Sequence, residues 1–307
     1  MCGAHDGFIS RLRETRHVVK VHEQEPSRTA LGAAAHRAAH QVLDGGRIFK
    51  DPLAGRILGD QQDAILVDPR RRRATGLRLF IAMRAAIAER ALANSVERRG
   101  VTQAVILGAG LDTFAYRNPF EGRLTVFEVD HPATQAWKRR RLAEANITIP
   151  DSMAFVPINL EHEPLRPALI AGGFDPEKRS FFVWLGVTYY LTREAVLTTL
   201  GVIGALPGGG EVAFDYGEPP DAMAWLWRIG HRRLAKRVAE GGEPFISAFT
   251  ASDMQAELRR LGFSEIDDRG PRELFGKLSR TPRWLLPKRG AHVLVARTPP
   301  TSGLAAA

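Results

Sequence analysis

The stretch from Val105 to Asp112 (VILGAGLD) constrains the fold of this chain more than any other. Its large apolar residues are typical of a strand buried on both faces, and its glycines of a tight turn that approaches a ligand closely. About 20 residues further on, a second apolar run (VFEVD) ends in Glu128 and Asp130, where a carboxylate can accept hydrogen bonds from ribose hydroxyls. Gly-x-Gly alone would indicate only a turn. With the acids, the pattern predicts a strand, a turn, a helix and a second strand that bind an adenosine-containing cofactor.

Alternating apolar runs and helical patterns continue beyond this unit. Strands are predicted at 104–107, 124–129, 154–156, 180–185 and 211–216, with helices at 133–145, 165–171 and 193–205. This order predicts a parallel sheet with right-handed crossovers and helices on both faces. Ligands bind beyond the carboxyl ends of such strands, so 108–112, Glu128, Asp130, Asn159, 185–190, Asp215 and Tyr216 are expected to face one crevice.

Helices also precede and follow this alternation. Ser27 is the predicted N-cap of a helix that ends at Gly45-Gly46, Asp51-Pro52 begins a short helix, and a long helix covers 75–98. A helix over 221–240 is predicted to form a lid, before a helix at 252–261 and strands at 264–267 and 291–296. We therefore predict one domain over 27–297, made of a helical extension (27–100), a cofactor-binding core (103–216), a lid helix (219–240) and the C-terminal part of the sheet (250–297). A mobile arm (1–26) and a disordered tail (298–307) are expected to flank it.

Composition limits the partners of the chain. Cys2 is the only cysteine among 307 residues, so we expect neither an intrachain disulfide nor a cysteine-based metal site, and assign no metal ligands. No signal peptide or membrane-length apolar run is present, which favours the cytoplasm and no membrane partner. The net charge is +9, but the basic clusters (70–73, 138–141, 232–237) are scattered and mostly lack interleaved aromatics. This favours a solvated surface over nucleic-acid binding.

Several stretches match one family together. They are SRTALGAAAHRA, IFKDPLA, VILGAGLDTFAYR, VFEVDHPATQAWKRR, FVPINL, FFVWLGVTYYL and GGGEVAFDY. They resemble the leucine carboxyl methyltransferase-like family of class I S-adenosylmethionine-dependent methyltransferases, which includes polyketide carboxyl O-methyltransferases. The resemblance implies an α/β fold with a Rossmann-like seven-stranded sheet whose last strand is antiparallel, an N-terminal helical extension and a helical lid. It also implies S-adenosyl-L-methionine as cofactor, S-adenosyl-L-homocysteine as product, and a small-molecule acid of secondary metabolism as methyl acceptor.

The resemblance also implies roles for individual residues. Gly108, Ala109, Gly110 and Asp112 would form the turn beneath the methionine part of the cofactor, and Asp130 with Glu128 would hold the ribose. Arg84 would pair with the cofactor carboxylate, and Asn159 with Leu160 would contact the adenine. Leu185 departs from the family, which usually has a glutamate there near the cationic end of the cofactor. Either cofactor affinity is weakened, another acid compensates, or this member is a cofactor-binding protein with a different purpose.

The acceptor decides which catalytic groups are needed. A carboxylate is ionised at neutral pH and needs alignment rather than a base, whereas a hydroxyl acceptor would need one, with His131, His162 or Asp215 as candidates. His131 belongs to the family motif, and a role in orienting its loop is favoured. Tyr189, Tyr190, Tyr216, Trp225 and Trp227 are predicted to surround a planar or apolar acceptor. The rival functions are a nicotinamide dehydrogenase, which Thr113 in place of the third fingerprint glycine disfavours, and an RNA methyltransferase. Whether the chain is a monomer or a homodimer stays open.

Overall fold

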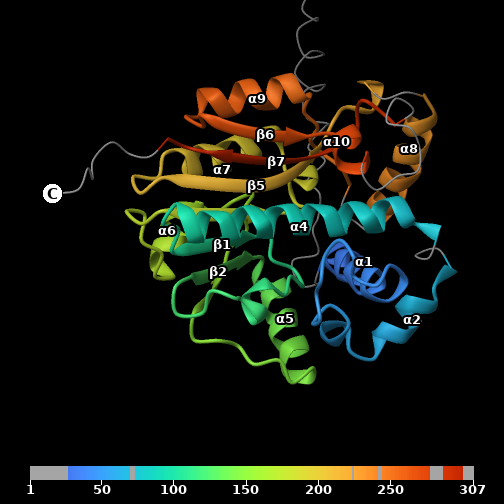
Figure 1. The fold of residues 1–307 in the computed structure, drawn as a ribbon, viewed down its shortest axis with the longest axis horizontal. Helices are drawn as coiled ribbons and strands as arrows, with labels where there is room; N and C mark the ends of the chain where they lie inside the picture. Colours follow the sequence, from blue (N-terminus) through green and yellow to red (C-terminus); the bar gives the residue numbers. More distant parts are fainter. Residues whose placement is uncertain (1–26, 70–72, 223–224, 241–243, 277–285, 300–307) are drawn as a thin grey trace, which may run out of the picture.

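The computed structural model contains one seven-stranded sheet (Figure 1). It describes residues 27–69, 73–222, 225–240, 244–276 and 286–299. The strands are β1 (Gln103–Leu107), β2 (Thr125–Asp130), β3 (Met153–Pro157), β4 (Ser180–Trp184), β5 (Gly210–Gly217), β6 (Glu265–Arg269) and β7 (Ala291–Arg297). Their order is β3-β2-β1-β4-β5-β7-β6, and β7 runs antiparallel to both of its neighbours. The predicted sheet with an antiparallel last strand is confirmed.

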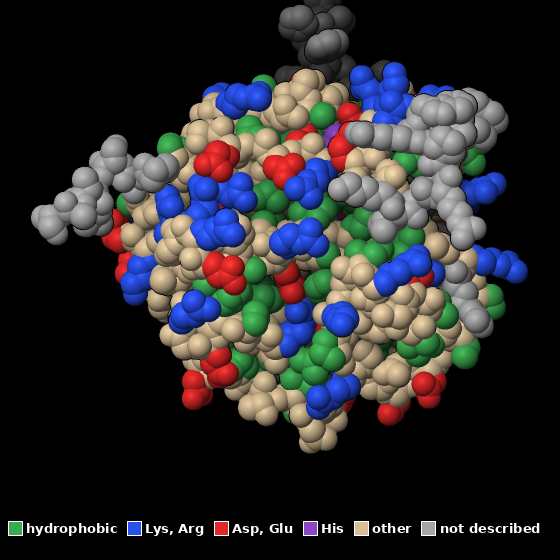
Figure 2. Space-filling view, viewed as in Figure 1, with side chains coloured by type: hydrophobic (Ala, Val, Ile, Leu, Met, Phe, Trp, Pro, Cys, Tyr) green, Lys and Arg blue, Asp and Glu red, His purple; other side chains and the backbone are tan. Residues whose placement is uncertain are grey.

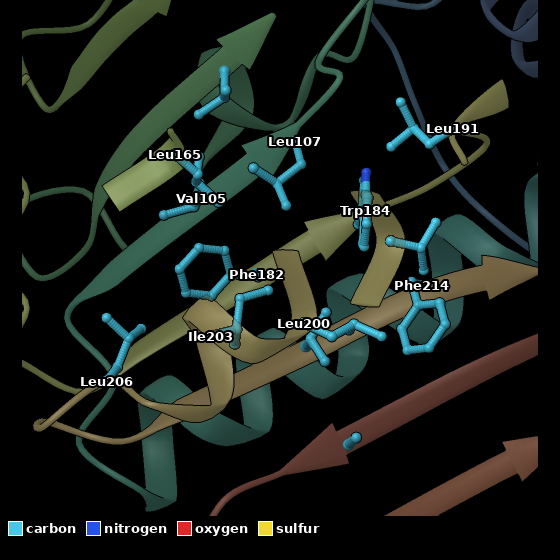
Figure 3. Packing of buried hydrophobic residues seen from close by; sticks show 14 of the residues in the cluster. Val105, Leu107, Leu165, Phe182, Trp184, Leu191, Leu200, Ile203, Leu206 and Phe214 are labelled. Atoms are coloured by element: carbon cyan, nitrogen blue, oxygen red, sulfur yellow. The ribbon is translucent and has the colours of Figure 1, made fainter. Parts of the chain in front are cut away.

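Helices cover both faces of the sheet. They are α1 (Arg28–Leu43), α2 (Gln61–Val67), α4 (Thr75–Arg98), α5 (Pro132–Glu144), α6 (Leu165–Ala171), α7 (Arg193–Gly204), α8 (Trp225–Glu240), α9 (Ala251–Arg260) and α10 (Pro271–Phe275). Leu200 and Ile203 of α7 pack on Phe182 and Phe214 of the sheet (Figure 3). On the other face, Leu92 of the long helix α4 packs in a second cluster with residues of β1 and β4. Because both faces are covered, β1 and β4 are buried along their whole length, as their continuous apolar sequences predict.

The N-terminal helices lie against the carboxyl ends of the first strands. The Oγ of Ser27 accepts the backbone N–H of Ala30 at 3.1 Å, so Ser27 caps α1 as predicted. The small side chains of Ala34, Ala35 and Ala38 are buried, which lets α1 approach its neighbours closely. One cluster joins them to Leu111 of the glycine turn. The helical extension is therefore part of the wall around that turn.

Three details differ from the sequence-based expectations. The helix predicted from Asp51-Pro52 is a run of turns that leads into the 3-10 helix η1 (Arg56–Leu58), because the side chain of Asp51 accepts the N–H of Leu53. Thr298, assigned to the tail, is buried and donates its backbone N–H to Gly210. The short helix α10 was not expected.

The predicted arm (1–26) and the tail from 300 onward lie outside the described residues. In the part of the chain that the structure describes, no helix is long and apolar enough to span a membrane.

The burial of Phe182 gives a test of this core. Its ring is fully buried on β4 and meets Phe174 edge-on at a centroid distance of 6.1 Å. Phe182→Ala removes these contacts and leaves a cavity, so we expect the free energy of unfolding to fall by about 3–5 kcal/mol. Denaturant unfolding measures this change. Ile170→Ala, at a side chain 47% exposed on α6, is the control and is expected to change stability by less than about 1 kcal/mol. Equal effects would contradict the described packing.

Candidate functional site

The turn after β1 requires glycine at two positions. Gly108 and Gly110 have φ angles of 62° and 45°, in the left-handed region. A Cβ atom on Gly108 would lie 2.4 Å from Cγ2 of Val187, and one on Gly110 would lie 2.8 Å from Cβ of Ala30. The turn therefore approaches both the segment after β4 and the first turn of α1 more closely than any side chain would allow.

A cavity of about 240 Å³ opens beside this turn. Its walls come from α1, α4, the turns after β1, β2, β3 and β4, and the segment after α8. Residues from the sequence-based site that line it are Arg84, Gly108, Ala109, Gly110, Asp112, Asp130, His131, Asn159, Leu160, Leu185 and Tyr190. These residues come from distant parts of the sequence, and the carboxyl ends of the parallel strands bring them together as predicted.

Asp130 joins the first two strands at the cavity. One carboxylate oxygen accepts the N–H of Gly110 at 2.5 Å, and the other accepts the N–H of His131 at 2.7 Å. Burial raises the pKa of Asp130, although these two backbone bonds favour the charged form. The acid that the spacing assigned to a ribose thus also fixes the glycine turn.

Arg84 reaches the cavity from the middle of α4. Its Nη1 donates to Oδ2 of Asp215 at 2.7 Å, across 131 residues of sequence. Asp215 is fully buried at the end of β5, and it also accepts the N–H of Gly186 at 2.5 Å and the hydroxyl of Tyr189 at 3.2 Å. Burial opposes the charge of Arg84, but Asp215 more than offsets this effect and raises the pKa of the guanidinium. Asp215 is therefore a positioning partner of Arg84, a role that the sequence did not suggest.

Leu185 lies in the cavity wall, next to these groups. The next residue, Gly186, donates its N–H to Asp215. A Cβ atom placed on Gly186 would lie 2.6 Å from Nη2 of Arg84. The buried carboxylate of Asp215 thus contacts Gly186, the residue that follows the position where the resemblance led us to expect a glutamate. Because Asp215 does not line the cavity and is already bound to Arg84, it offers no free acceptor there, and the three alternatives for Leu185 stay open.

Glu128 does not line the cavity, which corrects its assignment to the ribose site. Its carboxylate is fully buried, 2.7 Å from Nζ of Lys138, and accepts the hydroxyl of Tyr116 at 3.0 Å. Burial raises the pKa of Glu128 to about 6, in spite of Lys138. Because side chains alternate along a strand, Glu128 and Asp130 share one side of β2, but the extra two residues carry Asp130 to the strand end. Lys138, which the sequence placed in a solvated cluster, is also buried, as the partner of Glu128.

The predicted aromatic pocket is only partly present. The ring of Tyr216 is buried away from the cavity, stacked on His292, and its hydroxyl donates to Asp268 at 2.8 Å. Tyr189 does not line the cavity either, because its hydroxyl is bound to Asp215 and its ring packs on Phe245. Tyr190 does line it, beside Pro244 and Ile246. A helix covers 225–240 as predicted, but the side chains of Trp225 and Trp227 lie outside the described part, and the lid stays a prediction.

The three candidate bases are placed differently from one another. Nδ1 of His131 accepts the N–H of Ala133 at 3.3 Å and caps α5, so a neutral ring carries its proton on Nε2 and can only donate there. This agrees with the expected orienting role. His162 is exposed and lies outside the cavity, and Asp215 is bound to Arg84. None of these three side chains presents a free acceptor to the cavity.

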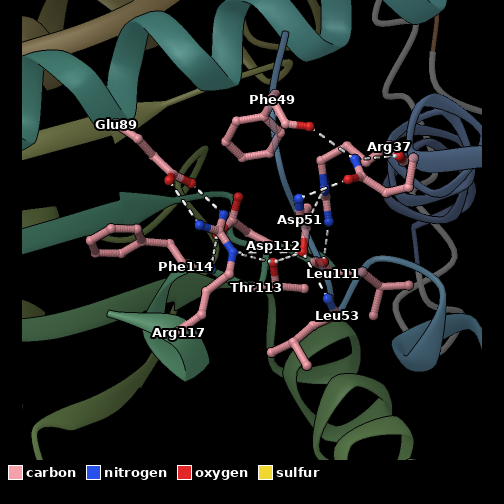
Figure 4. Close-up of polar contacts among 11 residues, drawn as sticks. Arg37, Phe49, Asp51, Leu53, Glu89, Leu111, Asp112, Thr113, Phe114 and Arg117 are labelled. Carbon is pink, nitrogen blue, oxygen red and sulfur yellow. Dashed lines mark hydrogen bonds and ion pairs between the residues drawn. The ribbon is translucent and has the colours of Figure 1, made fainter. Parts of the chain in front are cut away.

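A buried network supports the turn from the opposite side (Figure 4). Asp51 accepts Nε of Arg37 at 3.0 Å and the hydroxyl of Thr113 at 2.7 Å. Arg117 donates to the same hydroxyl at 3.0 Å and forms a two-bond ion pair with Glu89 of α4. Sequence analysis missed this network because its members are separated by up to 80 residues, from Arg37 to Arg117 (117 − 37 = 80), and carry no shared motif. For two of its members a signal was available, because Arg37 and Glu89 are charged residues within alanine-rich helices.

The strand order, the single antiparallel strand and a ligand cavity at the glycine turn together define the class I methyltransferase fold. A protein of the DUF574 family from Streptomyces avermitilis has the same fold, with a TM-score of 0.54 over 90% of this chain and 99% of that chain, at 18% identity. The family model for leucine carboxyl methyltransferase matches residues 30–204. The chain belongs to the leucine carboxyl methyltransferase family.

Two relatives are informative. The Bacillus subtilis protein named "Putative S-adenosyl-L-methionine-dependent methyltransferase YktD" is 40% identical over 183 residues, which cover 58% of this chain and 59% of that protein. A protein of Mycobacteroides abscessus with the same description is 30% identical over 224 residues, or 70% of each chain. The match thus spans less than two thirds of YktD. These findings place the chain in a family of methyltransferases and not among the nicotinamide dehydrogenases.

Asp130 provides the test of the site. Asp130→Ala removes the predicted contact to the ribose and the acceptor for the Gly110 N–H, so the dissociation constant for S-adenosylhomocysteine should rise at least tenfold, about 1.4 kcal/mol. Isothermal titration calorimetry measures this change. Asp267→Ala, at an exposed acid on β6, is the control and should leave the affinity unchanged. An unchanged dissociation constant for Asp130→Ala would contradict the assignment.

Proposed function

We propose that this protein is an S-adenosylmethionine-dependent O-methyltransferase that esterifies the carboxylate of a small-molecule acid, with secondary metabolism as the expected context. The observation that carries the proposal is the cavity itself. Its wall combines the backbone of a glycine turn, an acid at the end of β2 and a buried arginine from α4. Gly108 and Gly110 would lie beneath the methionine part of the cofactor. Asp130 would hold its ribose, and Arg84 would pair with its carboxylate.

The available side chains favour a carboxylate over a hydroxyl acceptor. When bound, S-adenosylmethionine supplies an electrophilic methyl group, which an ionised carboxylate can accept without losing a proton first. A hydroxyl acceptor needs a base, and His131, His162 and Asp215 offer none to the cavity. The work left to the protein is to align the acceptor and exclude water. Ile81, Val183, Leu185, Tyr190 and Ile246 give the cavity the apolar walls for that.

The distribution of surface charge favours a small molecule over a nucleic acid as partner. Lysines and arginines are spread over the face shown in Figure 2, with acidic side chains among them, instead of forming one continuous basic stripe. This distribution favours a solvated surface over nucleic-acid binding.

A panel of acids with two nucleophiles tests the acceptor class. Hydroxybenzoic acids offer a carboxylate and a phenol in one molecule, and we expect methylation on the carboxylate only. Mass spectrometry after mild alkaline hydrolysis distinguishes the products, because an ester loses its methyl group and an ether keeps it. The rate should be nearly independent of pH above about 6, since a carboxylic acid with a pKa near 4 is already ionised. Ether formation that rises with pH would favour the hydroxyl alternative.

Leu185→Glu separates a normal methyltransferase from a repurposed cofactor-binding protein. The wall at this position already contains Arg84, so a glutamate would have a cation nearby. We expect cofactor affinity to increase by about threefold to tenfold with little change in melting temperature, since one charge-assisted contact is added. Calorimetry and thermal unfolding are measured on the same sample, with Leu185→Gln as an uncharged control. A large loss of stability without a gain in affinity would support the repurposed function, because the glutamate would then be buried without a partner.

A further inference from the structure

A short segment after α8, residues 244–249, forms one edge of the cavity, and we call it the strap. Pro244 and Ile246 of the strap line the cavity. The side chain of Ile246 is 44% exposed, so the strap lies at the mouth of the cavity and not in the core. The strap belongs to no helix or strand. Its position therefore depends on contacts with neighbouring segments.

The strap is bound to the 3-10 helix η3 (Thr188–Tyr190), which follows β4. The backbone carbonyl of Tyr189 accepts the N–H of Ile246 at 2.7 Å and that of Ser247 at 3.3 Å. The hydroxyl of Ser247 is directed inward and donates to the carbonyl of Thr188 at 2.7 Å. The strap thus fixes the backbone of Tyr189.

The ring of Tyr189 is confined as well. Phe245 of the strap packs on it at a centroid distance of 5.5 Å, and the ring of Tyr190 lies 6.4 Å from it. On β5, a Cβ atom placed on Gly217 would lie 3.0 Å from Cε1 of Tyr189. A ring packed between the strap and β5 has little freedom to rotate, so a displacement of the strap would also move its hydroxyl.

That hydroxyl reaches the carboxylate behind Arg84. It donates to Oδ2 of Asp215 at 3.2 Å, and the same oxygen accepts Nη1 of Arg84 at 2.7 Å. Burial and the negative charge of Asp215 raise the pKa of Tyr189 well above its ordinary value. The hydroxyl therefore keeps its proton at physiological pH and serves Asp215 as a donor. Tyr189 connects the strap at the mouth of the cavity with the ion pair in its wall.

Asp215 determines where the guanidinium of Arg84 points. Its Oδ1 accepts the N–H of Gly186 at 2.5 Å, so hydrogen bonds fix both oxygens of the carboxylate. One donor of Arg84 is bound to Asp215, whereas its other N–H groups have no acceptor among the described residues, and the side chain lines the cavity. Because a guanidinium is a rigid planar fork, any rotation of the carboxylate redirects these remaining donors. A group that binds an anion well needs such support from locked neighbours.

We propose that Tyr189 is a positioning residue for Arg84, through which the strap sets how well the guanidinium binds the carboxylate of the cofactor. The inference rests on the proposed function, which brings that carboxylate to Arg84. It gives Tyr189 neither a proton-transfer step nor a contact with the ligand. Without the hydroxyl the ion pair would persist but be less well oriented, so the affinity should fall by roughly threefold to tenfold.

Titration calorimetry of Tyr189→Phe with two probes, direct or by competition, tests the proposal. S-adenosylhomocysteine carries the carboxylate, and methylthioadenosine lacks the whole amino acid part. We expect the affinity for S-adenosylhomocysteine to fall about threefold to tenfold and that for methylthioadenosine to change less than about twofold. Tyr216→Phe is the matched control, because its hydroxyl also donates to a buried carboxylate, that of Asp268, outside the cavity. This control should leave both affinities unchanged.

The strap is tested separately by Ser247→Ala, which removes its bond to Thr188. We expect this variant to weaken S-adenosylhomocysteine by about twofold to fivefold. The double variant with Tyr189→Phe should bind within about twofold of Tyr189→Phe alone, because both changes act through one hydroxyl. Losses that multiply in the double variant would show that the strap does not act through Tyr189, and would overturn that part of the inference.

Two results would overturn the role of Tyr189 itself. Equal losses for both probes would show that the residue only maintains the shape of the cavity, and an unchanged affinity for S-adenosylhomocysteine would show that Arg84 needs no support from it. If Tyr189→Phe does not fold, Ser247→Ala must by itself weaken S-adenosylhomocysteine and spare methylthioadenosine. Failure of the wild-type protein to bind S-adenosylhomocysteine would instead overturn the proposed function, so the two failures are distinguishable.

Discussion

Close backbone approach at the glycine turn is the constraint on which the site depends. Val187 and Ala30 occupy the space that a Cβ on Gly108 or Gly110 would need, so the segment after β4 and the helix α1 both pack directly on the turn. The same turn donates an N–H to Asp130, which links it to the end of β2. The helical extension, the first two strands and the segment after β4 thus meet at two glycines. A side chain at either position would separate these elements and open the cavity.

Local patterns were sufficient to predict most of this fold. Continuous apolar runs identified the strands to within a residue or two, because a strand buried on both faces has no alternation to obscure it. Ser27 and the Gly45-Gly46 pair marked the limits of α1 for reasons that lie within a few residues of each end. The prediction of a helix after Asp51 was wrong. The side chain of Asp51 accepts the N–H of Leu53 and forms a turn, and the capping rule does not distinguish such a turn from a helix start. The sequence could also not show that α10 would form in a five-residue segment without a clear periodic pattern.

The site was predictable where one short segment carries the chemistry, and less so where the partner is remote. Gly108, Gly110 and Asp130 stand in motifs and line the cavity. Glu128 is two residues from Asp130, which lines the cavity, and Tyr216 follows Asp215, the partner of Arg84. Both Glu128 and Tyr216 nevertheless face buried partners of their own. Their direction depends on contacts with Lys138 and Asp268, which sequence spacing does not encode. Arg84 came only from the family resemblance, and its pairing with Asp215 needs the tertiary fold.

The charged groups around the cavity follow one physical rule. A buried charge is tolerated when it is paired, and here Arg37, Arg84, Arg117 and Lys138 all have acidic partners. Pairing holds these side chains in place, so that they can shape the wall of the cavity. Among the described residues, the acids that line the cavity without a cationic partner are Asp112, Asp130 and Glu161, and a ligand can meet their charge. Under the proposed function, the walls of this cavity would align a ligand by such preset charges and would not need to transfer a proton.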